Sequence, residues 1–416
     1  MDGKLPLALY GAGQRAATEK KIAKKHGIPV CIIDADKSKQ GFTVLGLPIV
    51  SLERAKETYK DFNIHVTLEQ RKRAEISEYL LEAGIAKDRI LNYEEFEKYP
   101  GCPYLETELH IDEQGLHQCC VFRDGKGLSS PSMGHKQKAE DTIEEWMDMR
   151  EKLIGEIKEG KANICTGCDM IKKRAYPSER KIRTLGLIPT SPCQLSCIYC
   201  NAINAKRPLG EGQKQLAREF DWRRIIDCLL KRGMMAADTL VGIAGGEPTI
   251  MPRKDELLDL INDFRLNLAT NGIVFDDRFA MMTARPGSMA VISVDAGTRE
   301  TYRRIKGMDA FEIVCGNIKK YRERGANITM KYIFMPENSN ETDMDGFISQ
   351  ALDAGVDNIQ CSVDFNRKAL LDEQTAGAIA RMMDKAISHG ILPSLIGDIL
   401  LNADEISMVN VNRERH

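Results

Sequence analysis

Residues 192–200 read Pro-Cys-Gln-Leu-Ser-Cys-Ile-Tyr-Cys, the most informative stretch of the chain. Its cysteines are Cys193, Cys197 and Cys200, which follow the spacing C-x3-C-x2-C. Three thiolates can bind three irons of a cubane [4Fe–4S] cluster, whereas a closed ferredoxin-type site uses four. The fourth iron then keeps an open coordination position, which indicates a cluster that reacts with a ligand touching it. The alternative is half of a zinc site, because C-x2-C is also a common structural zinc spacing.

Three downstream segments favour the cluster over zinc. They are Gly-Gly-Glu-Pro at 245–248, Thr-Asn-Gly at 270–272 and Ile-Ser-Val-Asp at 292–295. Gly245 and Gly246 allow a backbone to approach a ligand closely, and Glu247 offers a carboxylate to an ammonium group. Ser293 and Asp295 are two residues apart at the end of an apolar run, so an extended strand would point both the same way.

Together these segments resemble the radical SAM superfamily. The resemblance implies a catalytic [4Fe–4S] cluster on the three cysteines, with S-adenosylmethionine bound to the open iron. One-electron reduction by a flavodoxin- or ferredoxin-type donor would cleave this cofactor to a 5′-deoxyadenosyl radical. The resemblance also implies cofactor contacts: Tyr199 beside the cluster, Gly245, Gly246 and Glu247 at the methionyl end, and Ser293 and Asp295 at the ribose hydroxyls.

Strand-like and helix-like segments alternate over residues 181–390, a pattern typical of a parallel α/β barrel. Six strands are expected, at 183–189, 239–244, 266–269, 289–295, 327–335 and 357–364. They predict an α/β fold with a partial (β/α)6 TIM-type barrel, the radical SAM fold. Active sites of such barrels lie at the C-terminal ends of the strands. Residues 391–416 are expected to form a C-terminal extension.

The pleat of the last expected strand predicts part of the barrel lumen. Gln360, Ser362 and Asp364 share one face, and the apolar residues between them share the other. The polar face should therefore line the lumen, and Cys361 should be a packed core thiol. Lys331 on the preceding strand is a further residue that could point inward.

Residues 1–96 predict a Rossmann-like domain. Gly11 to Ala16 has the pattern G-x-G-x-x-A between a strand and a helix, and Asp34 ends the next strand. A nucleotide phosphate would lie at the helix N-terminus, and Asp34 would reach a ribose or base. The segment resembles domains of sugar N-acetyltransferases and surface-polysaccharide enzymes, which favours a nucleotide-linked sugar as substrate. The alternative is a nucleotide fold kept for docking or dimerisation.

Residues 97–180 resemble the twitch domain, a shorter relative of SPASM domains that carries an auxiliary iron–sulfur cluster. A strand is expected over 105–111 and a charged helix over 142–159. The resemblance implies a second [4Fe–4S] cluster on Cys102, Cys120, Cys165 and Cys168, with Cys119 as the spare or swapped ligand. Zinc fits four cysteines equally well.

Length and composition limit the number of domains, the kinds of partner and the cellular compartment that can be expected. A chain of 416 residues should contain two or three domains. Its 59 basic and 61 acidic residues nearly cancel, which argues against non-specific nucleic-acid binding. No apolar run approaches the roughly 20 residues that span a bilayer. The N-terminus does not resemble a signal peptide, which predicts a cytoplasmic protein. The 12 cysteines of the chain are therefore expected to be metal ligands rather than disulfides.

The sequence thus predicts a radical SAM enzyme that abstracts hydrogen from a small-molecule substrate, with oxidation, epimerisation or bond formation assisted by the auxiliary cluster. One alternative is a ribosomal-peptide maturase of the SPASM or twitch type. An alternative of another class is a non-catalytic iron–sulfur electron carrier.

Overall fold

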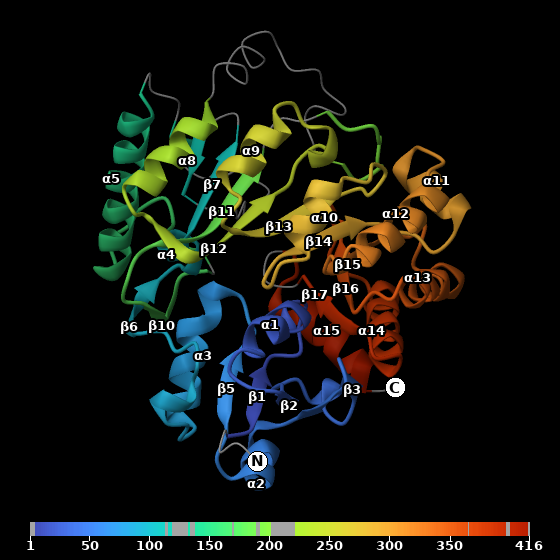
Figure 1. Cartoon of the computed structure of the whole chain (residues 1–416), viewed down its shortest axis with the longest axis horizontal. Helices are drawn as coiled ribbons and strands as arrows, with labels where there is room; N and C mark the ends of the chain where they lie inside the picture. Colours follow the sequence, from blue (N-terminus) through green and yellow to red (C-terminus); the bar gives the residue numbers. More distant parts are fainter. Residues whose placement is uncertain are drawn as a thin grey trace. The chain divides into compact units, whose positions relative to one another are not determined.

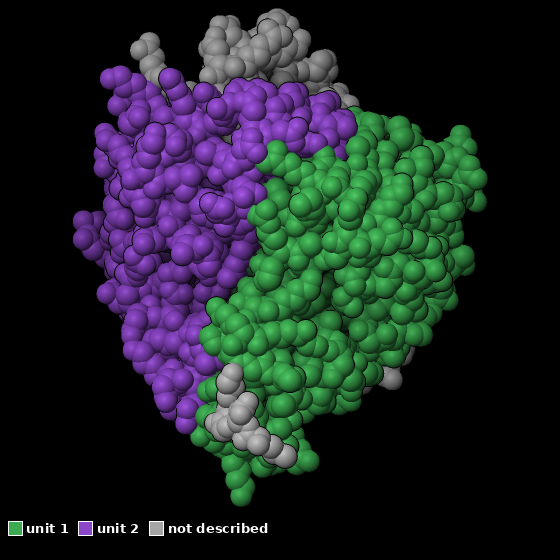
Figure 2. All heavy atoms as spheres, viewed as in Figure 1, with its two compact units in different colours: residues 1–68, 193–206, 267–416 green, residues 69–192, 207–266 purple. Residues whose placement is uncertain are grey.

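The computed structural model describes residues 5–112, 115–118, 132–133, 138–168, 170–188, 192–200, 221–364, 366–396 and 400–414. The chain forms two compact units, each built from separate stretches of sequence (Figure 2). Its helices and strands are labelled in Figure 1. Unit 1 comprises residues 1–68, 193–206 and 267–416, and unit 2 comprises residues 69–192 and 207–266. Each unit is described below by itself.

The N-terminal part of unit 1 is a five-stranded sheet in the order β3-β4-β2-β1-β5. Strand β1, between β2 and β5, has the sequence Leu-Ala-Leu-Tyr and is buried throughout, as expected for a strand covered on both faces. Strands β1, β2, β4 and β5 are parallel, whereas β3 pairs with β4 in an antiparallel hairpin. The elements are β1 (Leu7–Tyr10), α1 (Ala16–Ala23), β2 (Pro29–Ile33), η1 (Lys37–Lys39), β3 (Thr43–Val44), β4 (Leu47–Val50), α2 (Leu52–Tyr59) and β5 (Asn63–Val66).

The C-terminal part of unit 1 alternates parallel strands and helices, as expected from the sequence. Neighbouring strands are consecutive along the chain from β13 to β17, and each pair is parallel. Several helices begin at a side-chain cap of the preferred type, including Asp276, Thr298, Asn340 and Asp372. The elements are β13 (Arg265–Thr270), α10 (Asp277–Thr283), β14 (Met289–Ser293), α11 (Arg299–Lys306), α12 (Phe311–Glu323), β15 (Ile328–Phe334), α13 (Glu341–Asp353), β16 (Asn358–Val363), α14 (Glu373–Ser388), β17 (Leu392–Leu395) and α15 (Ala403–Glu414).

The two parts of unit 1 are joined by polar contacts between residues far apart in sequence. Gln360 on β16 donates from Nε2 to Oε1 of Gln14 over 2.9 Å, and Lys21 donates to Oδ1 of Asn327 over 2.5 Å. Arg413 of α15 contacts Asp36 across 3.2 Å. The glycine-containing loop after β1 therefore lies against the sheet that contains β16.

Unit 2 contains a mixed sheet in which β11 lies between β12 and β7, parallel to both. Strands β8 and β9 continue it in antiparallel orientation. The cysteine-bearing segment 97–180 thus supplies strands beside β11. The elements are α3 (Gln70–Glu82), η2 (Lys87–Arg89), β6 (Phe96–Gly101), α4 (Pro103–Thr107), β7 (Glu108–Asp112), β8 (Gly115–His117), β9 (Ser132–Met133), α5 (Ala139–Lys158), β10 (Lys172–Pro177), β11 (Ile182–Ile188), α8 (Trp222–Lys231), β12 (Met235–Ile243), η3 (Pro248–Ile250) and α9 (Lys254–Leu260).

The strand expected over 105–111 is wrong in its first half. Residues Pro103–Thr107 form the short helix α4, and the strand begins only at Glu108. Pro103 occupies the first helical turn, where its fixed φ favours the helix. All five residues of α4 are buried, whether they are apolar or polar. The alternation of apolar and polar residues therefore does not distinguish a strand from a helix in this segment.

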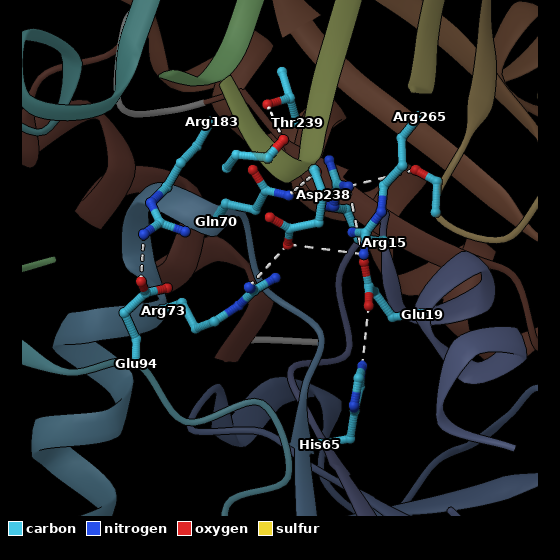
Figure 3. Close-up of polar contacts among 12 residues, drawn as sticks. Arg15, Glu19, His65, Gln70, Arg73, Glu94, Arg183, Asp238, Thr239 and Arg265 are labelled. Atoms are coloured by element: carbon cyan, nitrogen blue, oxygen red, sulfur yellow. Dashed lines mark hydrogen bonds and ion pairs between the residues drawn. The ribbon is translucent and has the colours of Figure 1, made fainter. Parts of the chain in front are cut away.

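Helix α3 follows β5 in sequence but belongs to unit 2, where polar contacts join it to β12 (Figure 3). Arg73 donates to the carboxylate of Asp238 over 3.0 Å, and Gln70 donates to the carbonyl oxygen of the same residue. Nearby, Arg183 pairs with Glu94. Buried guanidinium groups require such partners, because an unpaired charge in the interior is strongly disfavoured.

Candidate cluster and cofactor site

The cluster loop, residues 193–200, is held in unit 1 by the end of α11. Ser196 donates its backbone N–H to the carbonyl of Lys306 over 3.1 Å, and Ile198 donates to that of Ile305 over 3.0 Å. Gly307, at the C-terminus of α11, has a φ of 73°. A Cβ there would lie 2.3 Å from Ser196 Oγ and 3.2 Å from its carbonyl oxygen, so the close approach of the loop requires glycine.

The three cysteines of the loop differ in exposure. Cys197 is buried, whereas Cys193 and Cys200 are partly exposed. Burial raises the pKa of Cys197, and the ammonium of Lys306 acts in the opposite direction. Among the described residues, no three Cys, His, Asp or Glu side chains form a preassembled metal-ligand group.

The Thr-Asn-Gly turn after β13 contacts this loop. Asn271 Nδ2 lies 3.7 Å from Cys193 Sγ, as a donor to sulfur, and 3.2 Å from Oε1 of Gln194. Amide donors to sulfur are one means by which proteins tune iron–sulfur clusters. A loop of three thiols, with an amide directed at one sulfur, fits a cluster that keeps one iron open. The structure therefore joins two of the predicted motifs.

The aligned pair expected of Ser293 and Asp295 does not form. Strand β14 ends at Ser293, and Asp295 has a left-handed backbone with a φ of 57°. The Asp295 side chain is fully buried, where it accepts hydrogen bonds from the Tyr199 hydroxyl (2.6 Å) and the Ile333 N–H (2.7 Å). It also pairs with the buried ammonium of Lys306. Ser293 remains partly exposed.

Within unit 2, the Gly-Gly-Glu-Pro segment follows β12 as expected. Gly245 and Gly246 both have positive φ, 84° and 56°, which glycine adopts without steric cost. Glu247 donates its N–H to the Pro192 carbonyl over 3.0 Å. Its buried carboxylate accepts from the N–H and hydroxyl of Thr249 and so caps η3.

The cysteines expected to hold an auxiliary cluster are only partly described. Cys102 is buried at the N-cap of α4. Cys165 and Cys168 form a tight turn in which the Cys168 N–H donates to the Cys165 carbonyl over 3.0 Å, with Gly167 at a φ of 83°. Cys119 and Cys120 lie outside the described residues. A four-cysteine site stays a prediction.

Strand register in unit 1 aligns a row of partly exposed polar side chains. Ser293 pairs with Lys331, Lys331 with Gln360, and Gln360 with Ser394. Burial lowers the pKa of Lys331, and the carboxylate of Asp295 partly offsets this. Gln360 and Lys331 thus occupy the face predicted to be the lumen.

The adjacent Cys361 is fully buried near Met382 and belongs to the core, as expected. Burial raises the pKa of its thiol to about 12.

The glycine-containing loop after β1 is bonded to itself. Asp34 accepts from the Ala12 N–H over 2.6 Å and from the Asp36 N–H over 2.8 Å, and its carboxylate lies 3.8 Å from Lys39. Gly11 has a φ of 110°, and a Cβ there would lie 2.8 Å from Leu68. In this conformation Asp34 binds the loop that was expected to bind phosphate.

Sequence reasoning missed Lys306 and Asn271 as neighbours of the cluster loop. Lys306 is the last of several basic residues in α11, and nothing in that run distinguishes it from its exposed neighbours Arg303 and Arg304. A weak signal was the glycine that follows it. Asn271 stood within a recognised motif, but its contact with Cys193 depends on the fold.

Comparison with known proteins shows a similarity over the part of the chain that contains this site. Residues 187–348 match the model described as the Radical SAM superfamily. A probable GTP 3′,8-cyclase of Saccharolobus solfataricus is 25% identical over 186 residues, which cover 43% of this chain and 56% of the relative. Mycofactocin maturase MftC of Mycobacterium tuberculosis is 27% identical over 158 residues, covering 37% of this chain and 38% of the relative. The chain thus spans about half or less of these relatives.

Among solved structures, SuiB of Streptococcus suis aligns with a TM-score of 0.41 at 14% identity, covering 64% of this chain and 56% of SuiB. No helix in the described part of the chain is both long and apolar enough to cross a membrane. The residues matched by the family model begin in β11 and contain the cluster loop and the three motifs downstream of it. On that match, residues 187–348 are similar to the radical SAM superfamily.

Proposed function

We propose that this protein is a radical SAM enzyme whose cluster is held by Cys193, Cys197 and Cys200. When bound, the cluster and S-adenosylmethionine supply a 5′-deoxyadenosyl radical that abstracts hydrogen from a substrate. The observation that carries the proposal is the cluster loop, fixed by two backbone hydrogen bonds to α11 and by Asn271 at Cys193, inside the matched family domain.

The chain's own residues have separate tasks in this proposal. The three thiolates bind the irons, and Asn271 keeps its amide directed at Cys193. Gly245 and Gly246 let the backbone approach the methionyl end of the cofactor. Glu247 would meet the ammonium group of the cofactor once its buried carboxylate exchanges Thr249 for that group. The barrel wall must exclude water and other hydrogen donors from the radical.

Of the two residues expected at the ribose hydroxyls of the cofactor, Ser293 is the one that makes this contact in our proposal. The Asp295 carboxylate is occupied by buried partners, whereas Ser293 is partly exposed at the end of β14. A flavodoxin- or ferredoxin-type protein supplies the electron.

For the substrate we propose a nucleotide-linked molecule, such as a nucleotide sugar. The similarity to proteins named probable GTP 3′,8-cyclase supports a nucleotide. Lys331 supports it too, because this residue lies in a polar row with Ser293 and Gln360 and an ammonium group suits a phosphate.

The second candidate substrate is a peptide. The similarity to mycofactocin maturase MftC supports it at least as well as the cyclases support a nucleotide. The internal bonds of Asp34 also leave the glycine-containing loop less suited to a nucleotide in this conformation.

We also propose that Cys102, Cys120, Cys165 and Cys168 bind an auxiliary [4Fe–4S] cluster. Four thiolates close such a cluster, so it would accept an electron from the substrate or orient it rather than generate the radical. The turn at Cys165–Cys168 supports a pair of ligands from one short segment.

The experiment is anaerobic reconstitution, followed by iron and sulfide analysis and a 5′-deoxyadenosine assay with dithionite and S-adenosylmethionine. We expect about eight irons per chain for two clusters. Cys197→Ala should abolish 5′-deoxyadenosine, whereas Cys315→Ala, a matched change at a buried thiol of α12, should not. Nucleotide sugars and peptides are then compared as stimulants of turnover. A fully loaded protein that never cleaves the cofactor with either class would refute the proposal and indicate an electron carrier.

A further inference from the structure

Lys306 is an unusual residue because its charged side chain is fully buried beside the cluster loop. Its side-chain exposure is 0%, as is that of its partner Asp295. A buried ammonium is tolerated only with a counter-ion and hydrogen bonds, because desolvation of an isolated charge costs several kcal/mol or more. Lys306 has both: it pairs with Asp295 Oδ2 and donates to the Tyr199 hydroxyl over 2.7 Å.

Asp295 completes a closed set of three side chains. The Tyr199 hydroxyl donates to Asp295 Oδ2 over 2.6 Å, and the other carboxylate oxygen accepts the Ile333 N–H. Asn338 fixes the backbone of the same residue by donating to its carbonyl over 2.8 Å. Every member is therefore placed by at least two others or by the backbone, which is the condition for a buried polar network to be stable.

The side chains of this network contact the cluster loop directly. Tyr199 belongs to the loop, between two of its cysteines, and its ring packs against Ile305 and Ile333. The carbonyl of Lys306 accepts the N–H of Ser196. Lys306 thus contacts the loop through its side chain at Tyr199 and through its main chain at Ser196.

The network is also electrostatically close to the cluster ligands. The Lys306 ammonium donates to the hydroxyl of Tyr199 over 2.7 Å, and Tyr199 lies between Cys197 and Cys200 in the loop. A cluster gains one negative charge on reduction. In a buried site of low dielectric, a nearby fixed cation therefore favours the reduced form.

We infer that Lys306 is a positioning residue that holds Tyr199 and the cluster loop in place and makes the cluster easier to reduce, with Asp295 as its counter-ion. This inference rests on the proposed function, since it requires a cluster at Cys193, Cys197 and Cys200. It assigns Asp295 to the support of the cluster rather than to the ribose of the cofactor.

The test is a redox titration of the reconstituted full chain, followed by electron paramagnetic resonance, with Cys197→Ala supplying the baseline from any auxiliary cluster. Lys306→Met should lower the ratio of reduced to oxidised cluster about tenfold at a fixed potential, which is about 59 mV for a one-electron couple. Arg303→Met removes the same charge from the exposed face of α11, where solvent screens it, and should leave the ratio unchanged. Lys306→Arg should restore most of the wild-type ratio.

A second comparison covers the case in which Lys306→Met leaves a carboxylate buried alone and the protein fails to load. Asp295→Asn with Lys306→Met removes both charges and is compared with Asp295→Asn alone; the double variant should have the lower reduced fraction. Equal potentials and spectra within each pair would overturn the inference. A wild-type chain with no more iron than Cys197→Ala would instead contradict the proposed function.

Discussion

Replacing Gly307 with alanine tests whether the end of α11 fixes the cluster loop. Gly307 has a φ of 73°, and a left-handed backbone costs a non-glycine residue roughly 1–2 kcal/mol. The new Cβ would also lie 2.3 Å from Ser196 Oγ, 3.4 Å from Ser196 Cβ and 3.2 Å from its carbonyl oxygen. The hydroxyl can rotate away, but the carbonyl cannot, so we expect a further penalty of about 1–2 kcal/mol from overpacking.

Gly355 provides the matched control. It follows α13 in the same unit with a φ of 62°, and a Cβ there would meet no atom within 4 Å. Gly355→Ala should therefore show only the backbone cost, about 1–2 kcal/mol, and should load iron normally.

The assay is urea unfolding together with iron content after reconstitution. We expect Gly307→Ala to lose about 2–4 kcal/mol of unfolding free energy in total and to bind less iron, because the loop must move away from α11. Equal stabilities and equal iron contents for the two variants would refute the reasoning that α11 positions the cluster loop.

Three further predictions concern single contacts. Asn271→Leu removes the amide donor to the sulfur of Cys193 and should lower the reduction potential while iron content is kept, as measured by redox titration. Because burial raises the pKa of Cys361 to about 12, its thiol should resist iodoacetamide at pH 9 in the folded chain and react once urea is added, as measured by mass spectrometry. The contribution of this thiol to the free energy of unfolding is full below its ordinary pKa and is lost as the pH rises towards 12. Asp238→Asn weakens the contact with Arg73 and should destabilise the protein by about 1–3 kcal/mol in urea. The nearby guanidinium groups hold the pKa of Asp238 below its usual range despite burial, so this contribution is present at neutral pH and is lost as pH falls through that lowered pKa.

Strand positions were largely predictable because hydrophobic patterning is local. The expected strands at 266–269, 327–335 and 357–364 each differ from the observed strand by one residue at each end. The prediction over 105–111 failed because all of α4 is buried, which removes the polar positions by which helix and strand are distinguished.

By itself the sequence determined the spacing of the three cluster cysteines and the glycines of the turns, because both depend on residues a few positions apart. Only the tertiary structure decided the partners of those residues. Lys306 and Tyr199 are separated by 107 residues, and Gln14 and Gln360 by 346. Asp34 and Asp295 were both expected to face a ligand, yet their carboxylates bind groups of the chain itself. The physical reason is that a buried charge must find a counter-charge or a donor, and only the folded chain determines which of its many polar groups lies within reach.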